Sequence, residues 1–356
     1  MKDIPGLKES FSRDRLDGCI ISKPANRQYL SGFTGTSGIL LLTEKDNILL
    51  TDFRYREQAV CQAQDFTVVQ HGPQLISTLR EWLDKLGLHR IGVEKDHLTL
   101  AAYDELVRNI PGVEFIPIQN PCEMPRMVKS TAELNLLKKA IEISDQSFCH
   151  IAGFIHPGLT EKEVGVELEF SMRRLGSEKN AFTTIVASGE RSALPHGVAS
   201  DKVIQKGDLV TLDFGAVYQG YHSDMTRTLV IGPAQERHRE IYEVVLTAQE
   251  AVLQALRPGM RGFEADGIAR DLIKEAGFGE YFGHGLGHGV GLEIHEGPRL
   301  SPQSEIILEP GMVVSVEPGV YIAGWGGIRI EDLALITSSG CESLTKSPKR
   351  FTEMIL

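Results

Sequence analysis

The segment VTLDFGAVYQGYHSDMTRTLV, residues 210–230, constrains the fold of this chain more than any other. Two strand-like runs flank Gln219-Gly220, which predicts a β-hairpin with a two-residue turn. Whether the turn is at 218–219 or at 219–220, Asp213 and Asp224 fall on one face of the sheet as direct or diagonal neighbours. Two carboxylates this close repel each other unless a cation lies between them or one keeps its proton. In isolation, such a pair is more typical of a solvated hairpin face.

Three histidines lie in a second segment, FGHGLGHGVGLEIHE, which also holds five glycines. Each glycine costs a helix about 1 kcal/mol relative to alanine, which argues against a helical HxxxH zinc site. An extended or looping backbone that closely approaches a ligand fits the glycine spacing better. A single buried histidine is usually a hydrogen-bonded core residue, but His284, His288 and His295 together indicate a functional site.

Two glutamates belong to strand-like runs further along the chain. MVVSVEPGVYI ends a β-branched run at Glu317, where a Pro-Gly pair stops the strand. IRIEDLALI resumes with a period of two, which predicts one strand with Arg329 and Glu331 on the same face. A cation there would hold Glu331 ionised and oriented. Alone, each glutamate is more typical of a protein surface.

Together these segments supply a hard, oxygen-rich ligand set without a thiolate: Asp213, Asp224, His288, Glu317 and Glu331. Four carboxylates and one imidazole suit a pair of divalent ions such as Mn²⁺, Co²⁺ or Zn²⁺, and argue against a structural zinc knot. The general order of divalent-metal affinities means that the ligands alone do not name the native metal. The sequence therefore predicts a two-metal hydrolytic site.

Residues from about 126 to 350 resemble the M24 metallopeptidase family of Xaa-Pro aminopeptidases, prolidases and methionine aminopeptidases. DFGAVYQGYHSDMTRT, HGLGHGVGLEIHE, SVEPGVY and GIRIED stand in the family's order and spacing, and all five ligand positions are filled. NRQYLSGFTGTSGILLLT and TDFRYREQA resemble the creatinase/prolidase-like N-terminal domain of Xaa-Pro peptidases. The resemblance implies a pita-bread catalytic domain, α+β with an antiparallel sheet, and argues against the metal-free members of the family.

The resemblance also implies roles for the ligands. Asp224 and Glu331 would bridge two metal ions, Asp213 would bind one ion, and His288 and Glu317 would bind the other. A two-metal-activated hydroxide would attack the peptide bond. Glu317 would carry its proton to the departing nitrogen.

Further side chains are expected around the substrate. By resemblance, His295 steadies the oxyanion, while His196 and His284 contact the proline side of the substrate or relay protons. Arg329 is expected to hold Glu331 or the path to the substrate, and Tyr321 to support the site. Without the resemblance, His196 is more typical of an exposed loop and Tyr321 equally of packing, whereas an exposed strand position is the less favoured alternative for Arg329.

The 356 residues are enough for two domains. Residues 1–122 alternate short apolar strands with helices, which is an α/β pattern. Residues 123–356 are expected to form an antiparallel sheet backed by helices, with the ligands on its open face. NPCEMPRMVK, with two prolines, is the expected linker.

Four helices and several strands are expected in the second domain. Ser130 with Glu133, and Thr160 with Glu163, are capping-box signatures that open two helices. Two more helices are expected at about 234–256 and 262–276, and strands at about 183–188, 208–218, 221–231, 312–317 and 328–336.

Charge, hydropathy and cysteine content argue against a nucleic-acid-binding, secreted or membrane-spanning protein. A net charge of −11 argues against nucleic acid as a partner, because phosphate binding needs a basic surface. MKDIPGLKESFSRDR is too charged for a signal peptide, and no apolar run approaches the ~20 residues that span a bilayer. Five widely spaced cysteines without a CxxC pair fit reduced thiols, so we expect a cytoplasmic protein and no membrane partner.

We expect an Xaa-Pro aminopeptidase that removes an N-terminal residue from peptides with proline at position 2. GFTGTSG and TDFRY favour this function over the alternative, an Xaa-Pro dipeptidase (prolidase). A third alternative is a metal-free interaction scaffold with the same fold. Two divalent ions per subunit, with Mn²⁺ first among them, and a homodimer are expected by resemblance. In such a dimer, Asp52 and Arg54 would reach a neighbouring subunit's site.

Overall fold

The computed structural model describes residues 7–356, and the chain divides into two compact units, Met1–Arg126 and Met127–Leu356. The division lies inside the segment expected as a linker, four residues beyond the expected boundary at 122/123, and that segment contains the short helix α6 (Glu123–Met127). The charged segment MKDIPGLKESFSRDR starts in residues 1–6, which lie outside the described residues.

Unit 1, Met1–Arg126, is built on a six-stranded mixed sheet in the order β4-β3-β2-β1-β5-β6. β1, β5 and β6 are parallel, β3 and β4 are parallel, and β2 is antiparallel to both its neighbours. The short apolar strands predicted in this part of the chain are present as β1 (Gly18–Ile21), β2 (Ile39–Thr43), β3 (Asn47–Thr51), β4 (Thr67–Gln70), β5 (Arg90–Glu94) and β6 (Glu114–Ile118).

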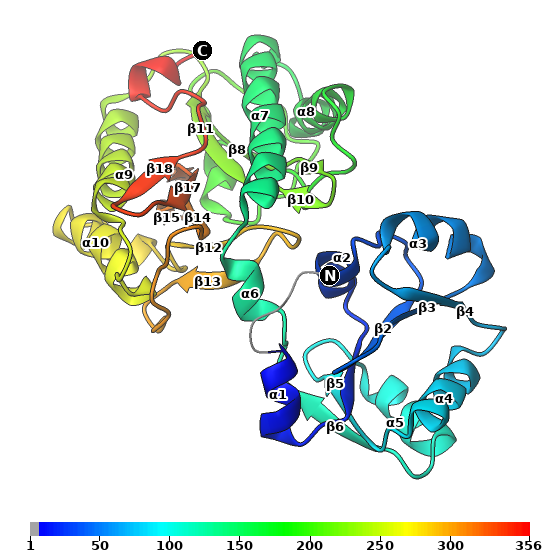
Figure 1. The fold of residues 1–356 in the computed structure, drawn as a ribbon. Coiled ribbons are helices and arrows are strands. Elements are labelled where there is room, and N and C mark those ends of the chain that lie inside the picture. The colour runs from blue at the N-terminus through cyan, green and yellow to red at the C-terminus, as the bar shows by residue number, and fades with distance from the viewer. Residues whose placement is uncertain (1–6) are drawn as a thin grey trace. The chain divides into compact units, whose positions relative to one another are not determined.

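Helices cover both faces of this sheet, which explains why its strands are almost continuously apolar (Figure 1). α4 and α5 pack on one face, and α1, α2 and α3 pack on the other. The predicted α/β architecture of this domain is therefore confirmed. The elements are α1 (Leu7–Asp14), α2 (Pro24–Ser31), η1 (Phe53–Tyr55), α3 (Arg56–Gln62), α4 (Leu75–Leu86) and α5 (Leu100–Asn109).

Unit 2, Met127–Leu356, contains antiparallel strands in four groups. They are a three-stranded sheet β11-β8-β7, a five-stranded sheet β13-β12-β14-β17-β18, and the hairpins β9-β10 and β15-β16. The α+β class is confirmed, whereas the prediction of one sheet is wrong. The strands are β7 (Ile185–Ser188), β8 (Leu209–Phe214), β9 (Val217–Tyr218), β10 (Tyr221–His222), β11 (Met225–Val230), β12 (Gly287–Gly289), β13 (Glu296–Leu300), β14 (Val313–Val316), β15 (Gly319–Ile322), β16 (Gly326–Arg329), β17 (Asp332–Ile336) and β18 (Cys341–Ser343).

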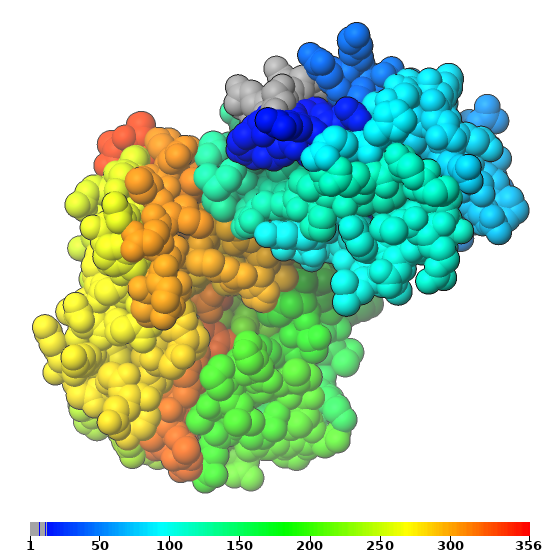
Figure 2. Space-filling view, turned by 90° about the horizontal axis from the view of Figure 1, so that it is seen from below, coloured from blue at the N-terminus to red at the C-terminus, as the bar shows by residue number. Residues whose placement is uncertain are grey.

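The four predicted helices of unit 2 are present and pack in pairs. Figure 1 shows α7 beside α8 and α9 beside α10, with strands between the pairs, and Figure 2 shows the green and yellow surfaces to which these pairs contribute. Both predicted capping boxes are formed, at Ser130 with Glu133 and at Thr160 with Glu163. In residues 7–356, no helix is long and apolar enough to cross a bilayer. The helices are α7 (Thr131–Phe154), α8 (Glu161–Arg174), α9 (Glu236–Ala255) and α10 (Gly262–Glu275), with the short turns η2 (Gly189–Ala193), η3 (Gly279–Tyr281) and η4 (Phe351–Glu353).

The predicted hairpin turn is formed by Gln219 and Gly220. Tyr218 pairs with Tyr221, and the two turn residues have φ of 47° and 82°, the positive values that a tight hairpin with a matching twist requires. The same register continues into β8 and β11, where Asp213 faces Thr226. Asp224 precedes Thr226 by two residues, so the two aspartates are diagonal neighbours on one face, as predicted.

The predicted single strand 328–336 is wrong, because the chain changes sheets in its middle. β16 ends at Arg329, in a hairpin with β15, and β17 begins at Asp332, in the five-stranded sheet. Between them the backbone N–H of Glu331 donates to Thr226 O at 3.1 Å. This crossing places Glu331 next to the β8–β11 pair, which a continuous strand would not do.

Candidate metal centre and active site

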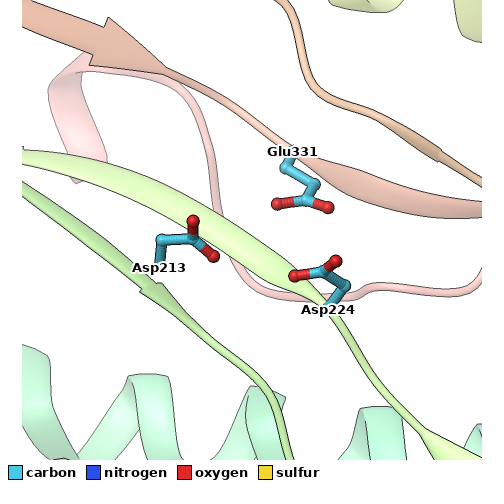
Figure 3. A group of neighbouring side chains, drawn as sticks. All are labelled: Asp213, Asp224 and Glu331. Carbon is cyan, nitrogen blue, oxygen red and sulfur yellow. The ribbon is translucent and has the colours of Figure 1, made fainter. Parts of the chain in front are cut away.

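Three carboxylates of unit 2 point toward one another (Figure 3). Asp213 lies in β8, Asp224 immediately precedes β11, and Glu331 lies between β16 and β17. One oxygen of each carboxylate lies within 4.8 Å of the other two. Asp224 and Glu331 are 6% and 1% exposed, so water screens little of their mutual repulsion.

His288 and Glu317 complete the group. His288 Nε2 lies 3.5 Å from Asp224 Oδ2 and 3.3 Å from Glu317 Oε1. His288 Nδ1 lies 3.1 Å from Gly289 O, and because a carbonyl only accepts, Nδ1 donates a hydrogen there and Nε2 is the nitrogen that faces the carboxylates. Ser315 Oγ accepts from the His288 N–H and donates to Glu317 Oε1, both at 3.0 Å. One serine thus orients two candidate ligands.

Arg329 and Thr226 orient two of the carboxylates, those of Asp213 and Glu331. Arg329 donates to Asp213 Oδ2 at 2.6 Å and through Nε to Thr226 Oγ1 at 3.0 Å. Thr226 Oγ1 donates to Glu331 Oε2 at 2.8 Å. The ion pair expected between Arg329 and Glu331 is therefore made with Asp213 instead, and Arg329 reaches Glu331 only through Thr226.

Two buried oxygens show that this group fits divalent cations. Asp213 Oδ1 and Glu331 Oε1 have no hydrogen-bond partner among the described residues. A buried carboxylate oxygen without a donor is costly unless a cation binds it. Together with an imidazole nitrogen and the other carboxylates, these oxygens form the hard ligand set that Mn²⁺, Co²⁺ or Zn²⁺ accepts.

The pKa values of these carboxyl groups also indicate that the group lacks compensating positive charge. Burial, together with the charges of Glu331 and Asp213, raises the pKa of Asp224 well above its ordinary value. Burial and the charges of Glu317 and Asp213 raise the pKa of Glu331 in the same way. Burial also acts on Glu317, but a hydrogen bond from His288 and its charge lower the pKa of that carboxyl to about 2. Metal ions would displace the protons that the raised pKa values retain.

All ten predicted site residues line one cavity of about 810 Å³. The structure therefore brings together side chains from segments far apart in the sequence, on β8, β12, β15 and β16 and on the loops around them. They are Asp213, Asp224, His288, Glu317, Glu331, His196, His284, His295, Tyr321 and Arg329.

The three other histidines of the site differ in their surroundings. His196 and His295 are exposed at the cavity, and their rings are free to meet a substrate. Partial burial of its ring in the cavity and the neighbouring His288 lower the pKa of His295 to about 4, so this ring is neutral near pH 7. His284 Nδ1 donates to Gly285 O at 2.8 Å, and its Nε2 lies 2.9 Å from the hydroxyl of Tyr321.

Arg329, Tyr321 and His284 form a chain of hydrogen bonds. Arg329 donates to the Tyr321 hydroxyl at 2.7 Å, so that hydroxyl donates to His284 Nε2. Both ring nitrogens of His284 are then occupied. His284 therefore holds Tyr321, and its contact with the substrate stays a prediction.

Three residues of the site were missed by the sequence analysis. Thr226 follows Asp224 by two residues and Ser315 precedes Glu317 by two, so their period-two spacing with a ligand was an available signal. Arg299 is found only through the pairing of β13 with β12, in which it faces His288. Its exposed side chain lines the cavity and makes no hydrogen bond or ion pair with any residue that the structure describes.

Family models match both units. The model of metallopeptidase family M24 matches residues 135–338, and that of the creatinase/prolidase N-terminal domain matches residues 4–128. The chain belongs to the M24 metallopeptidase family. This M24 peptidase is 40% identical over 351 residues to an Xaa-Pro dipeptidase of Pyrococcus horikoshii, covering 97% of each chain.

Solved structures agree with this assignment. An Xaa-Pro dipeptidase from Bacillus anthracis is 48% identical, with a TM-score of 0.96 over 99% of each chain. An X-Pro aminopeptidase from Thermotoga maritima is 40% identical, with a TM-score of 0.91 over 98% of this chain and 100% of that one. The predicted pita-bread fold and the dinuclear metallopeptidase family are confirmed. The names of the relatives favour the dipeptidase over the aminopeptidase that we expected.

Proposed function

We propose that this M24 peptidase is an Xaa-Pro dipeptidase, which hydrolyses the bond between an N-terminal residue and a C-terminal proline. The observation that carries the proposal is the position of Arg299, which faces His288 across β12 and β13 and has no partner among the described residues. A guanidinium in a cavity binds a carboxylate through two parallel hydrogen bonds. In an Xaa-Pro dipeptide, the proline carboxylate lies one residue from the scissile bond, within the reach of such a group.

The candidate ligands would hold two divalent cations, which supply the positive charge that acidifies a water molecule and polarises the scissile carbonyl. Glu317 would accept the proton of the attacking water and deliver it to the proline nitrogen as that nitrogen departs. His295, neutral near pH 7, would donate a hydrogen bond to the developing oxyanion. Arg329 and Thr226 would keep Asp213 and Glu331 in place.

Recognition of proline depends on shape, because the scissile bond is a tertiary amide without an N–H. Apolar residues of the cavity, Phe182, Pro195 and Val198, offer a surface for the pyrrolidine ring. His196 lies between the last two in the sequence and would contact the substrate beside that ring. These groups explain specificity for proline but do not by themselves distinguish a dipeptide from a longer peptide.

An Xaa-Pro aminopeptidase is the second candidate, supported by the similarity to the Thermotoga maritima protein and by the N-terminal motifs GFTGTSG and TDFRY. In unit 1, Asp52 forms an ion pair with Arg54 at 2.8 Å, and Phe53 between them is 74% exposed. The contribution of Asp52 and Arg54 to a neighbouring subunit's site stays a prediction, as do the homodimer, the cytoplasmic location and Mn²⁺ as the native metal.

The two candidates are separated by the turnover of Ala-Pro and of Ala-Pro-Ala-Ala by the Mn²⁺-loaded protein. A dipeptidase hydrolyses Ala-Pro and leaves the tetrapeptide almost intact, because the added residues remove the carboxylate from Arg299. Equal or faster hydrolysis of the tetrapeptide contradicts the proposal and identifies an aminopeptidase. Hydrolysis of neither peptide contradicts both.

The role of Arg299 is tested separately by Arg299→Gln. Loss of a charge-assisted hydrogen bond is worth about 2 kcal/mol, so we expect KM for Ala-Pro to rise by roughly 30-fold. Turnover of Ala-Pro amide, which lacks the carboxylate, should change little. Arg257→Gln changes the same charge at an exposed position and serves as the control. An equal effect on both substrates contradicts the carboxylate contact.

A further inference from the structure

A buried carboxylate that does not line the cavity, that of Glu161, accepts hydrogen bonds from three residues. Glu161 is the first residue of α8 and is fully buried. Its Oε1 accepts from the N–H and hydroxyl of Ser188 at 2.7 and 2.8 Å, and its Oε2 accepts from the N–H and hydroxyl of Ser200 at 3.0 and 2.6 Å. Arg191 donates to Oε2 at 3.0 Å and supplies the opposite charge. A buried carboxylate is tolerated only with partners of this kind.

Ser188 and Ser200 are the two ends of one stretch, residues 188–200, which we call the His196 segment. Glu161 therefore holds both ends of this segment at the start of α8. It also holds the interior, because Arg191 donates a second hydrogen bond to Val198 O at 2.7 Å. Glu161 thus holds both ends of the segment and, through Arg191, its interior, beside two other anchors: the Ile185–Val198 bridge and the hydrogen bond from the Gly327 N–H to Ser192 Oγ at 2.8 Å.

The middle of the His196 segment forms a wall of the cavity, lined by Pro195, His196 and Val198. Pro195 O accepts a hydrogen bond from Arg329 at 3.4 Å, which joins this wall to the candidate metal centre. The ring of His196 makes no hydrogen bond with a described residue, so the backbone that carries it decides where it lies. Glu161 is one of the groups that hold that backbone in place.

We propose that Glu161 is a positioning residue of the peptidase reaction, which fixes the His196 segment and so places His196 against the substrate. The proposal rests on the proposed function, because it requires His196 to contact the substrate. Glu161 touches neither the cavity nor a candidate ligand, and it acts only through the segment it holds. Misplacement of a reacting or binding group by about 1 Å can reduce a rate by roughly 100-fold.

Glu161→Gln tests the proposal with little change in size. The amide replaces one acceptor oxygen with a donor, and that donor faces the backbone N–H of Ser188 or Ser200. We expect kcat/KM for Ala-Pro to fall by roughly 10- to 100-fold with unchanged metal content, because none of the five candidate ligands contacts Glu161. Ser200→Ala removes a single hydroxyl and guards against misfolding of the first variant; its expected loss is about fivefold.

Glu163→Gln is the matched control in the same helix. The Glu163 carboxylate accepts from the N–H and hydroxyl of Thr160 and closes the capping box of α8, but it does not contact the His196 segment. We expect this variant to keep the wild-type kcat/KM. An equal loss in Glu163→Gln would show that the start of α8, rather than the Glu161 contacts, matters, and would overturn the proposal.

A double-mutant cycle with His196→Ala separates positioning from general structural damage. If Glu161 acts through His196, Glu161→Gln costs little once the imidazole has been removed, so the two losses do not add. Fully additive losses in kcat/KM overturn the proposal.

Hydrogen exchange gives a readout that does not depend on catalysis. In the metal-free protein, amides of residues 188–200 should exchange faster in Glu161→Gln than in wild type, and at the wild-type rate in Glu163→Gln. Unchanged exchange in Glu161→Gln overturns the proposal. If the wild-type protein hydrolyses no Xaa-Pro peptide, the proposed function fails, while exchange still decides whether Glu161 holds the segment.

Discussion

At the scale of single residues, the site is defined by buried carboxylates whose negative charge is not neutralised by the protein. Asp213 Oδ1 and Glu331 Oε1 lack donors among the described residues, while burial and like charges raise the pKa of Asp224 and Glu331. Such an arrangement is unfavourable for a folded protein by itself and becomes favourable when cations bind. Without metal, these buried carboxylates destabilise the folded protein. Metal binding relieves this free-energy cost, and the relief adds to the affinity of the site for metal.

Asp224→Asn should abolish tight metal retention and turnover. The amide lacks the negative charge and the second acceptor oxygen with which Asp224 would hold divalent cations. We expect Ala-Pro turnover to fall by at least about 100-fold, the upper end of losses seen even for partners of metal ligands. Metal analysis after dialysis and peptide hydrolysis measure the two effects. Asp201→Asn, at a side chain 85% exposed, is the control, and wild-type activity in Asp224→Asn would exclude this metal site.

Stability of the metal-free protein should depend on pH through Glu331. Its pKa is raised in the folded state, so its contribution to the free energy of unfolding is fully present below the unfolded pKa of about 4.5 and is lost as pH rises through the folded pKa. Glu331→Gln resembles the protonated acid at every pH. We therefore expect the variant to gain stability relative to wild type as pH rises from about 5 to 8.

Urea unfolding in the presence of a chelator measures this difference. Glu342→Gln, at an exposed position in β18, should show no such trend. With saturating Mn²⁺ the order should reverse, because metal stabilises only the folded protein with its ligand intact. A constant difference between wild type and Glu331→Gln across this pH range would contradict the raised pKa.

At the scale of secondary-structure elements, the β8–β11 hairpin sets the spacing of two ligands. Gly215 lies opposite Asp224 in the register, and a Cβ added there would lie 2.0 Å from Ser223 O. The two backbones can approach this closely only without a side chain at that position. The glycine therefore belongs to the geometry of the metal centre, although it carries no functional group.

Gly215→Ala should weaken both the fold and the site. Overpacking of this size costs about 1–3 kcal/mol in the free energy of unfolding, and the strand shift that relieves it separates Asp213 from Asp224. Urea unfolding and metal content after dialysis are the measurements. Gly267→Ala in α10, where no atom lies within 4 Å of the added Cβ, should instead stabilise by about 1 kcal/mol. Wild-type stability and metal content in Gly215→Ala would contradict this account.

The elements that the sequence predicted are those with local signals. Gln219-Gly220 predicted its turn, and Ser130 with Glu133 predicted a helix start, because turn and cap preferences are properties of a few adjacent residues. The break between Arg329 and Asp332 carried no such signal. The alternation of IRIEDLALI suits one strand as well as two, and a contact with Thr226, more than 100 residues earlier, decides between them.

At the scale of the whole molecule, the two units have separate hydrophobic cores. All candidate ligands lie in unit 2, so metal should stabilise that unit alone. The two tryptophans divide evenly between the units, with Trp82 in unit 1 and Trp325 in unit 2. Each is therefore a fluorescent probe of one core.

Removal of metal should lower the unfolding temperature reported by Trp325 and leave that reported by Trp82 unchanged. Metal at 1,000 times its dissociation constant stabilises the folded state by about 4 kcal/mol. Trp82→Phe and Trp325→Phe variants isolate the two signals, and thermal unfolding with and without a chelator is the measurement. Equal shifts of both probes would show that the units unfold as one cooperative body.

By itself, the sequence determined which side chains could bind metal, where the hairpin turns, and which segments form the strands of unit 1. These features follow from side-chain chemistry and from preferences of neighbouring residues. The tertiary structure alone decided that Arg329 pairs with Asp213, that Arg299 faces His288, and that Glu161 holds the His196 segment. Those contacts join residues distant in the chain, and they depend on how strands pair and cross rather than on any local pattern.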